Sequence, residues 1–254
     1  MKNSDEYSSI AEVYDLLNDQ VDYRRWAEYI DETVRRFEST RSSLMLDLAC
    51  GTGKMTFEMR RLGYDMTAID ISPEMLNEAF LKAQKEGAGD ILWLCQDMTE
   101  FELYGTVDAV ICCLDGINHL TKKSDVEKCF SLVHNYLIPD GIFMFDVNTP
   151  HKFDTVYRDR DYVLEEEGVL LAWQNLYDEG SGICEFVTSV FTENEDGSYS
   201  REDGVQTERR YGKEELRDLL EKAGFEVLCI SGNYGYEPPE NDADRWYITA
   251  RCKK

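Results

Sequence analysis

The chain has 254 residues and carries 27 Lys and Arg against 51 Asp and Glu, a formal net charge of −24. An excess of acids on this scale repels nucleic-acid backbones and anionic membrane surfaces unless a basic stripe compensates, and the basic residues here occur only as scattered pairs. The hydrophobic share of 43% is sufficient for a buried core, and no run approaches the roughly 18 apolar residues of a membrane span. We therefore expect a globular cytoplasmic protein, monomeric or homodimeric, with neither a nucleic-acid nor a membrane partner.

The eight cysteines and three histidines are too dispersed to predict a disulfide framework or a zinc site. Five of the cysteines lie within apolar, strand-like runs: Cys50, Cys95, Cys112, Cys113 and Cys229. The sequence contains no Cys-x-x-Cys pair, which is the usual element of a structural zinc site. We expect buried, reduced thiols and no metal site.

The N-terminal region 10–37 has apolar residues at helical spacing, and the polar break Asn18–Asp22 divides it into two predicted helices. From residue 44 onwards, short continuous apolar runs alternate with helical stretches. The runs are Leu44–Ala49, Asp65–Ile69, Ile91–Cys95, Val107–Leu114 and Gly141–Val147, and helices are expected at Lys54–Leu62, Pro73–Lys85 and Lys122–Leu137. Ser72 before Pro73 is typical of a helix N-cap. Continuous apolar strands joined by helices indicate a parallel sheet buried on both faces.

The pattern changes again after residue 150, where apolar and polar residues alternate with a period of two. The alternating segments are Tyr162–Trp173, Ile183–Phe191 and Tyr199–Tyr211. Residues 151–210 contain 15 acidic and 6 basic residues, a net charge of −9. We predict an antiparallel β insertion here. The α/β pattern then resumes with the helix Lys213–Ala223 and the strands Phe225–Ser231 and Trp246–Cys252.

The segment Leu44–Lys54 is the most informative, because a strand runs into a glycine pair and then into a helix. In open α/β sheets, ligands bind at such a junction, beyond the carboxyl ends of the strands. Gly51 and Gly53 allow the backbone to approach a ligand closely. Asp70 ends the next strand 19 positions after Gly51, where an acid can accept hydrogen bonds from ribose hydroxyls. The pattern predicts a site for a nucleoside-containing cofactor.

Two classes of cofactor use such a junction, and two residues distinguish them. A dinucleotide-binding loop requires a third small residue at position 56, which is Thr56 here, and it places a pyrophosphate near the start of the helix. Asp47 at the end of the strand would set a negative charge beside that phosphate. A ligand with a cationic amino-acid end suits Asp47 better, so a nicotinamide-dependent oxidoreductase is disfavoured but stays open.

These residues resemble motif I of the class I S-adenosylmethionine-dependent methyltransferases, in which a hydrophobic strand containing Asp leads into a Gly-Thr-Gly loop. The resemblance implies that S-adenosyl-L-methionine is the cofactor and S-adenosyl-L-homocysteine the product. It implies that the loop holds the methionine part through Asp47, Ala49, Cys50, Gly51, Thr52 and Gly53. Asp70 and Ile71 correspond to the ribose site, and Gln96, Asp97 and Met98 after the third strand correspond to the adenine site.

The resemblance covers nearly the whole chain and implies two further parts of the site. Residues 1–40 resemble a helical lid over the cofactor, in which Tyr14, Tyr23 and Trp26 are candidate cofactor contacts. The segment Cys113–Leu120 matches the loop after the fourth strand, which closes over the sulfonium and faces the acceptor. Leu114 is then a cofactor contact and Asn118 a candidate substrate contact.

Two candidate catalytic groups lie in the same loop. His119 could act as a base for a protonated acceptor, or could only pack and hydrogen-bond beneath the loop, and the two are equally favoured. Asp115 could bind an amine acceptor, although capping of the following helix is slightly favoured. Neither role is obligatory, because the sulfonium already makes the methyl group electrophilic and catalysis depends mainly on in-line positioning.

Further candidate substrate contacts lie at the end of the insertion and beyond it: Arg209, Tyr211 and Tyr234. Arg209 and its neighbour Arg210 could hold a carboxylate. Cross-strand pairing of these arginines with Glu202 or Glu208 is the more common arrangement.

The predicted fold is α/β: a doubly wound, mostly parallel seven-stranded sheet of the Rossmann-like methyltransferase type. In it, residues 1–150 and 211–254 form the cofactor-binding domain, the last strand is antiparallel, and residues 151–210 form a β cap over the acceptor site. The predicted activity is methyl transfer to an N or O atom of a small molecule. A tRNA- or RNA-modifying methyltransferase, an NAD-dependent oxidoreductase and a non-catalytic S-adenosylmethionine-binding module are the alternatives.

Overall fold

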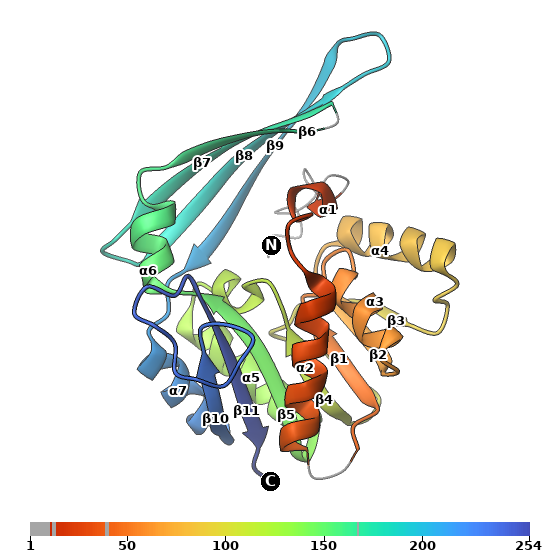
Figure 1. Cartoon of the computed structure of the whole chain (residues 1–254), viewed down its shortest axis with the longest axis vertical. Coiled ribbons are helices and arrows are strands. Elements are labelled where there is room, and N and C mark those ends of the chain that lie inside the picture. The colour runs from red at the N-terminus through yellow and green to blue at the C-terminus, as the bar shows by residue number, and fades with distance from the viewer. Residues whose placement is uncertain (1–10, 12–13, 39–40, 167) are drawn as a thin grey trace.

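The main sheet of the computed structural model has seven strands in the order β10-β11-β5-β4-β1-β2-β3 (Figure 1). The structure describes residue 11 and residues 14–38, 41–166 and 168–254. The strands are β1 (Leu44–Leu48), β2 (Asp65–Asp70), β3 (Leu92–Cys95), β4 (Val107–Cys112), β5 (Leu137–Asn148), β10 (Phe225–Ser231) and β11 (Arg245–Cys252). Strands β1 to β5 pair in parallel, and β11 runs antiparallel between β5 and β10. The predicted fold with an antiparallel last strand is confirmed.

Helices cover both faces of this sheet: α2 (Tyr23–Phe37), α3 (Lys54–Arg61) and α4 (Pro73–Glu86) on one, and α5 (Lys123–Tyr136) and α7 (Lys213–Lys222) on the other. The short helices are α1 (Tyr14–Leu17), α6 (Pro150–Lys152), the 3-10 helix η1 (Gly116–His119) and the π-helix η2 (Phe153–Tyr157). The predicted N-terminal helices break at the predicted place, although residues 1–10, 12 and 13 lie outside the described residues. Ser72 caps α4 as predicted, since its hydroxyl accepts a hydrogen bond from the Met75 N–H.

Successive residues of the central strands face opposite sides of the sheet, which produces two buried cores. Leu46 and Leu48 of β1 pack in one core with side chains of α5 and α7. Met45 of the same strand packs in the other core with side chains of α2 and α3. Because both faces are covered, the central strands are apolar along almost their whole length, as the sequence pattern indicates.

A second sheet, called the cap, extends over one end of the main sheet (Figure 1). Its strands are β6 (Asp161–Glu166), β7 (Val169–Asp178), β8 (Ile183–Glu193) and β9 (Tyr199–Arg209), which pair antiparallel in that order. The prediction of one alternating segment over Tyr162–Trp173 is wrong. The chain reverses within it, so that Glu166 pairs with Val169 beside Gly168, whose φ is 81°. The alternation continues on both sides of this turn and therefore did not reveal it.

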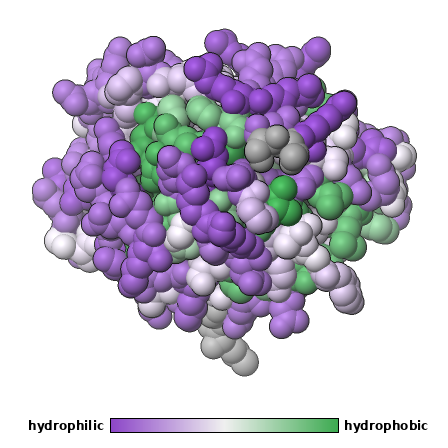
Figure 2. Space-filling model, turned by 90° about the horizontal axis from the view of Figure 1, so that it is seen from below, coloured by the Kyte–Doolittle hydropathy of each residue, from purple (hydrophilic) through white to green (hydrophobic). Residues whose placement is uncertain are grey.

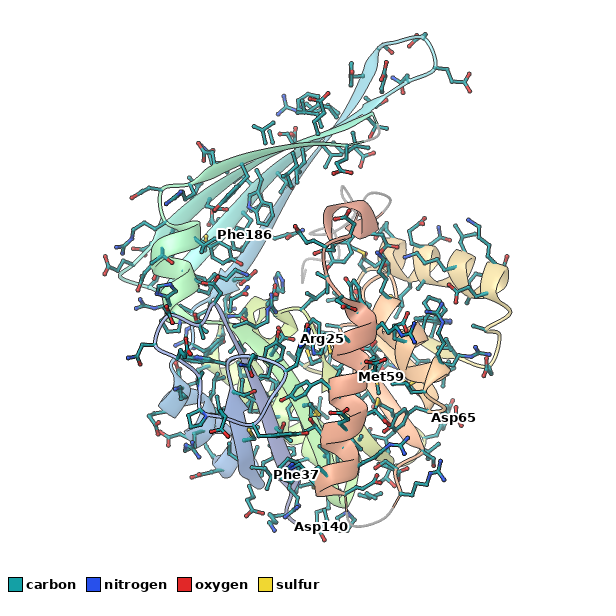
Figure 3. The ribbon with its side chains drawn as sticks, viewed as in Figure 1. Arg25, Phe37, Met59, Asp65, Asp140 and Phe186 are labelled. Carbon is teal, nitrogen blue, oxygen red and sulfur yellow. The ribbon has the colours of Figure 1, made fainter. Side chains whose placement is uncertain are left out.

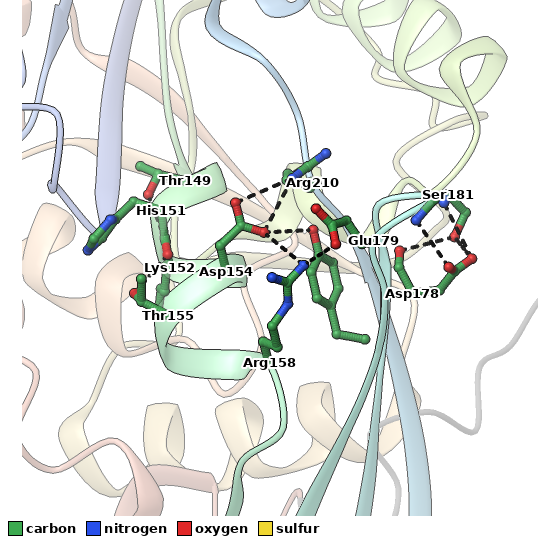
Figure 4. Close-up of polar contacts among 12 residues, drawn as sticks. Thr149, His151, Lys152, Asp154, Thr155, Arg158, Asp178, Glu179, Ser181 and Arg210 are labelled. Carbon is green, nitrogen blue, oxygen red and sulfur yellow. Dashed lines mark hydrogen bonds and ion pairs between the residues drawn. The ribbon is translucent and has the colours of Figure 1, made fainter.

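Ion pairs connect the base of the cap to the helix η2 (Figure 4). Arg158 binds Glu179 in the β7–β8 turn, with Nη2 and Oε2 2.6 Å apart. Arg210 donates to Asp154 at 3.4 Å, and the Tyr177 hydroxyl donates to the same carboxylate at 3.3 Å. Because these groups are largely open to solvent, each pair contributes at most about 1 kcal/mol, and together they orient the base of the cap.

The hydropathy of the surface and the state of the cysteines largely agree with the expectations from composition. Figure 2 shows a mostly hydrophilic surface at the end of the molecule opposite the cap. Among the described residues, no helix is long and apolar enough to cross a membrane. All eight cysteines are free thiols, as expected. The expected burial is wrong for Cys95, which is exposed because it ends the edge strand β3, and Cys50, Cys113 and Cys229 are only half-buried.

Candidate active site

One cavity of about 400 Å³ lies beyond the carboxyl ends of the parallel strands. Its volume is in the range of small-molecule sites. Most of the predicted cofactor residues line it: Tyr14, Tyr23, Asp47, Ala49, Cys50, Gly51, Thr52, Asp70, Ile71, Gln96, Asp97, Met98 and Leu114. His119 lines its other end. Gly53 and Trp26 lie outside this lining.

The loop from β1 to α3 forms the floor of the cavity through residues with left-handed backbone. Ala49, Gly51 and Gly53 have φ angles of 60°, 54° and 81°. Packing excludes a side chain at Gly53 as well, because a Cβ atom there would lie 2.6 Å from the Trp93 ring. Gly53 therefore acts through the turn and the close approach of β3, whereas Gly51 leaves its face of the loop open to the cavity.

Asp47 is almost fully buried beneath this loop. It is 1% exposed, and its Oδ2 accepts a hydrogen bond from the Thr56 hydroxyl at 2.5 Å. Burial raises the pKa of Asp47 to about 7, although the bond from Thr56 acts in the opposite direction. A carboxyl group with such a pKa ionises readily when a cation binds beside it.

Asp70 at the end of β2 fastens two loops together. Its Oδ2 accepts from the Gly51 N–H at 2.7 Å and its Oδ1 from the Ser72 N–H at 2.9 Å. Burial raises its pKa, and the two backbone donors oppose that rise. Each carboxylate oxygen carries a second lone pair, so Asp70 can still accept hydrogen bonds from a ligand in the cavity.

The loop after β3 is fixed by its own side chains. The Glu102 N–H donates to Gln96 Oε1 at 2.7 Å, and both the N–H and the hydroxyl of Thr99 donate to Asp97 Oδ1 at 2.7 Å. Met98 lines the cavity between them and packs on the main core. The lining of the cavity here thus includes the apolar side chain of Met98 and the polar side chains of Gln96 and Asp97.

Helix α1 is tied to the floor of the cavity by Asp15. Its carboxylate accepts from the Thr52 hydroxyl at 2.5 Å and forms an ion pair with Lys82 of α4. The neighbouring Tyr14 and the more distant Tyr23 line the cavity. Trp26 lies elsewhere: it is 3% exposed and packs on Tyr234 and Tyr247, with ring centroids 6.1 and 5.6 Å away.

The loop after β4 is strained and is held by ionic contacts. Leu114 and Asp115 both have left-handed backbone, with φ of 58° and 54°. Asp146 of β5 accepts from the Asp115 N–H at 3.0 Å, and Arg245 of β11 binds both carboxylates, with Nη2 2.8 Å from Asp115 Oδ1. The favoured capping role of Asp115 is wrong, because its side chain makes no cap hydrogen bond to η1 and binds Arg245 instead.

Asp115 and Glu208 of β9 have opposite protonation behaviour. Burial opposes ionisation of Asp115, but the charges of Arg245, Lys152 and His119 outweigh it and lower its pKa. Burial and then the negative charge of Asp115 raise the pKa of Glu208 well above its usual range. The pKa values of these two neighbouring carboxyl groups are therefore shifted in opposite directions.

His119 lies beside this pair. Its Nδ1 is 3.2 Å from the Thr207 carbonyl oxygen, and ligand atoms of Asp115, His119 and Glu208 all lie within 4.8 Å of one another. These three residues are of the types that bind metal ions, and they are too far apart in the sequence to have been recognised as a cluster. Arg245 already pairs with Asp115, with Nη2 and Oδ1 2.8 Å apart, which makes this group less suited to a metal ion.

The side chains predicted to contact the substrate form contacts within the protein itself. Asn118 Nδ2 donates to the Arg209 carbonyl at 2.9 Å, and its Oδ1 accepts from the Asn148 N–H at 2.9 Å. Tyr211 is fully buried and donates to the Leu120 carbonyl, while Tyr234 packs in the aromatic cluster of Trp26.

The expected cross-strand pairing of the two arginines is wrong. Arg209 Nη2 pairs with Glu215 of α7 at 2.9 Å, and Arg210 pairs with Asp154. Glu202 and Glu208 belong to β9, as Arg209 does, so neither lies across the sheet from it, and the residue opposite Arg209 is Ile183.

Sequence reasoning missed several cavity-lining residues, among them Ser72, Met75 and Thr99, and three charged residues beside the cavity: Arg245, Asp146 and Glu208. Arg245 reaches Asp115 across 130 positions of the chain, and no local pattern encodes that contact. Asp146 had a detectable feature, since an acid interrupts the apolar run of β5 and is only 1% exposed. Glu208 is one of the many acids of the insertion, and only the register of β9 distinguishes it.

Comparisons with known proteins agree with this geometry. A model of a methyltransferase domain family matches residues 45–141, which include the floor of the cavity and the loop after β4. "Putative methyltransferase YqeM" from Bacillus subtilis (strain 168) is 32% identical, over 98% of both chains. The crystal structure of an S-adenosylmethionine-dependent methyltransferase from Clostridium acetobutylicum ATCC 824 superposes with a TM-score of 0.87 at 28% identity, over 98% of this chain and 99% of that one. The chain belongs to the class I S-adenosylmethionine-dependent methyltransferases.

Membership of this family has two consequences for the expectations from sequence. S-adenosylmethionine is the cofactor of the methyltransferase, and the NAD-dependent alternative is wrong. A glycine/sarcosine N-methyltransferase from Halorhodospira halochloris is a more distant relative, 25% identical over 84% of this chain and 77% of its own length.

Proposed function

We propose that this methyltransferase transfers the methyl group of S-adenosylmethionine to an N or O atom of a small molecule held under the cap. The observation that carries the proposal is one cavity whose lining includes both Asp70 and His119. Tyr14 and Met75, which line the cavity, pack in one cluster with Leu171 and Val190 of the cap. A covered cavity of about 400 Å³ suits a small acceptor beside the cofactor.

The cofactor assignment follows from the chemistry of the lining. Asp47 would bind the ammonium group of the methionine part, since burial of its carboxyl group favours a cationic partner. Asp70 would accept hydrogen bonds from the ribose hydroxyls. Asp97 would bind the exocyclic amine of the adenine, and Met98 would pack on the ring.

The acceptor end of the cavity offers a base. If Nδ1 of His119 donates to the Thr207 carbonyl, then Nε2 carries the basic lone pair. Transfer forms a bond from the acceptor atom to the methyl carbon and breaks the sulfur–carbon bond, whose electron pair stays on sulfur. A protonated or hydroxylic acceptor loses its proton to Nε2 of His119, and Asp115 favours the resulting imidazolium.

Nitrogen acceptors are supported by a relative whose name specifies N-methylation of glycine and sarcosine. The surface argues in the same direction, since residues 151–210 carry a net charge of −9 and attract cationic molecules. The same charge disfavours tRNA, whose phosphates would be repelled. In this proposal residues 1–150 and 211–254 are the cofactor-binding domain, and residues 151–210 cover the acceptor.

The test compares Asp70→Asn with Asp65→Asn. Both residues belong to β2, but Asp65 lies at its exposed start, away from the cap (Figure 3). Calorimetry with S-adenosylhomocysteine should show an affinity lower by a factor of roughly 10–100 for Asp70→Asn, because charge-assisted hydrogen bonds to ribose contribute about 1.5–3 kcal/mol. Asp65→Asn should bind like the native chain. Equal binding by both variants would refute the cofactor assignment, and an absence of methyl transfer across broad amine and phenol panels would favour the non-catalytic alternative.

A further inference from the structure

The cap has an inner face that is buried against the rest of the molecule. Residues paired across antiparallel strands point to the same side, so Asn175, Phe186 and Gln206 form one row, and Trp173 and Thr188 stand in the next. Phe186 contacts Tyr157 of η2, with centroids 4.9 Å apart, and lies on the side of the cap that faces the main domain (Figure 3). This inner face is therefore the face that looks toward the active site.

Three polar atoms on this face have no hydrogen-bond partner among the residues that the structure describes. They are Trp173 Nε1, Asn175 Oδ1 and Gln206 Nε2. Asn175 is 6% and Gln206 9% exposed, so neither amide obtains its missing bond from bulk solvent. Two of the atoms are donors and one is an acceptor.

An unpaired buried polar atom costs free energy, and folded proteins retain few of them. These three occur in two adjacent rows of one sheet, and a neighbouring hydroxyl group on the same face is paired. Thr188, for example, donates to the Gly204 carbonyl at 3.3 Å. Such a concentration indicates groups whose partner is a bound molecule.

The row lies outside the lining of the cavity and is connected to His119, which lines it, through Thr207 and Glu208. His119 contacts the carbonyl of Thr207, the residue between Gln206 and Glu208. Gln206 and Glu208 point to the same face of β9, and Glu208 lies within 4.8 Å of His119. Trp173 completes the connection, since it packs both on the cluster of Tyr14 and Met75 and on the cluster of Tyr157 and Phe186.

We infer that Trp173, Asn175 and Gln206 form the part of the acceptor site that recognises uncharged polar groups. The acceptor then carries hydroxyl or amide groups beyond its reacting atom: two of them accept from Trp173 and Gln206, and one donates to Asn175. The rings of Trp173 and Phe186 provide an apolar wall, which favours a compact hydroxylated molecule over a flat aromatic acceptor or a purely aliphatic one. This inference rests on the proposed function and assigns the substrate class of the same site.

The first experiment measures thermal unfolding of the full chain without ligand for Gln206→Met and Gln174→Met. Both residues lie on the cap, but Gln174 is exposed on its outer face. Removal of an unpaired amide should raise the melting temperature of Gln206→Met by about 2–4 °C, whereas Gln174→Met should leave it unchanged. A lower melting temperature for Gln206→Met would show that the amide stabilises the fold, and would overturn the inference.

The second experiment adds matched amine pairs to the complex with S-adenosylhomocysteine: glucosamine against cyclohexylamine, and serinol against isopropylamine. The hydroxylated member of a pair should stabilise the native complex more, and Gln206→Met should lose at least half of that difference. The inference is overturned if no hydroxylated amine exceeds its counterpart, or if the difference persists in Gln206→Met. Failure of S-adenosylhomocysteine itself to bind would refute the proposed function instead, so the two failures are distinguishable.

Discussion

Backbone strain in this methyltransferase is concentrated at the cavity. Among the described residues, five other than glycine have positive φ, and three of them lie in loops of the active site: Ala49, Leu114 and Asp115. The two loops meet where Gly116 approaches Ala49, so closely that a Cβ atom at Gly116 would lie 2.7 Å from Cys112 Sγ. Such conformations cost about 1–3 kcal/mol each and persist only where surrounding contacts impose them. Arg245 and Asp146 supply those contacts for Asp115.

Two glycines with positive φ allow the free-energy cost of backbone strain to be measured separately from the cost of a packing clash. Gly53→Ala should lower the free energy of unfolding by about 2–4 kcal/mol, because a left-handed alanine costs about 1 kcal/mol and the clash with Trp93 adds about 1–3 kcal/mol. Gly63→Ala should cost only the first amount, since its Cβ atom would meet open space. Denaturant unfolding measures both, and equal losses would contradict the close packing at Gly53.

The pKa of Asp47 should make cofactor binding depend on pH. Because its carboxyl group has a pKa of about 7 in the empty site, binding of an ammonium group below that pH must displace a proton. The affinity for S-adenosylhomocysteine should therefore fall as the pH decreases below 7, by up to tenfold per pH unit, and level off above 7. Asp47→Asn should bind weakly and without this pH dependence. Calorimetry from pH 5.5 to 8.5 checks both statements, and a flat profile for the native chain would contradict the role of Asp47.

At the scale of elements, Asp15 ties α1 to the floor of the cavity. Asp15 accepts a hydrogen bond from the Thr52 hydroxyl and forms an ion pair with Lys82. Its removal should therefore release α1 from the cavity floor. We expect Asp15→Ala to speed the dissociation of S-adenosylhomocysteine several-fold, because Tyr14 would no longer be held over the site. Asp19→Ala, an exposed change in the turn after α1, is the control. Stopped-flow displacement measures the rates, and equal rates in the two variants would refute a closing role for α1.

The elements most accurately predicted from sequence were those with the strongest local pattern. The strands β1, β2 and β4 are continuous apolar runs, and the cofactor loop has glycines that the backbone requires. The cap was predicted as a β insertion, but the reversal at Gly168 was missed because alternation has the same form on both sides of a turn. The contacts of Arg209, Asn118 and Arg245 could not be predicted, because they depend on which distant segments the fold brings together.

At the scale of the whole molecule, the net charge of −24 overstates the charge of the surface. Among the described residues, Asp47, Asp70, Asp146 and Glu208 are buried and the side chain of Asp115 is 18% exposed. Asp47 and Asp70 accept hydrogen bonds, Asp115 and Asp146 share Arg245, and burial raises the pKa of Glu208. The proposed site for a cationic cofactor thus includes acids that the fold keeps away from water.

Glu208 joins the cap to the main domain, and its raised pKa gives a test of this junction. A carboxyl group whose pKa is raised on folding stabilises the protein fully only below its unfolded pKa, and this stability is lost as the pH rises from there to the raised folded pKa. Glu208→Gln mimics the protonated acid without this loss. Its free energy of unfolding should therefore match the native value at about pH 4 and exceed it at pH 7. Glu202→Gln, exposed on the same strand, is the control, and a Glu208→Gln variant that is less stable than the native chain at pH 7 would contradict the raised pKa of Glu208.

The bonds of Asn118 have a consequence for how this enzyme can change over evolutionary time. A single buried amide holds the strand that leads into the cap, at Asn148, and the strand that leaves it, at Arg209. The two ends of the insertion are therefore pinned at one point of the main domain. The outer turns of the insertion can therefore change in length without displacing this point. The inner rows of the cap cannot be exchanged so freely, because Leu171 and Val190 pack with Tyr14 and Met75 of the cavity lining. If the cap covers the acceptor as proposed, acceptor preference can diversify mainly through side chains between these contacts.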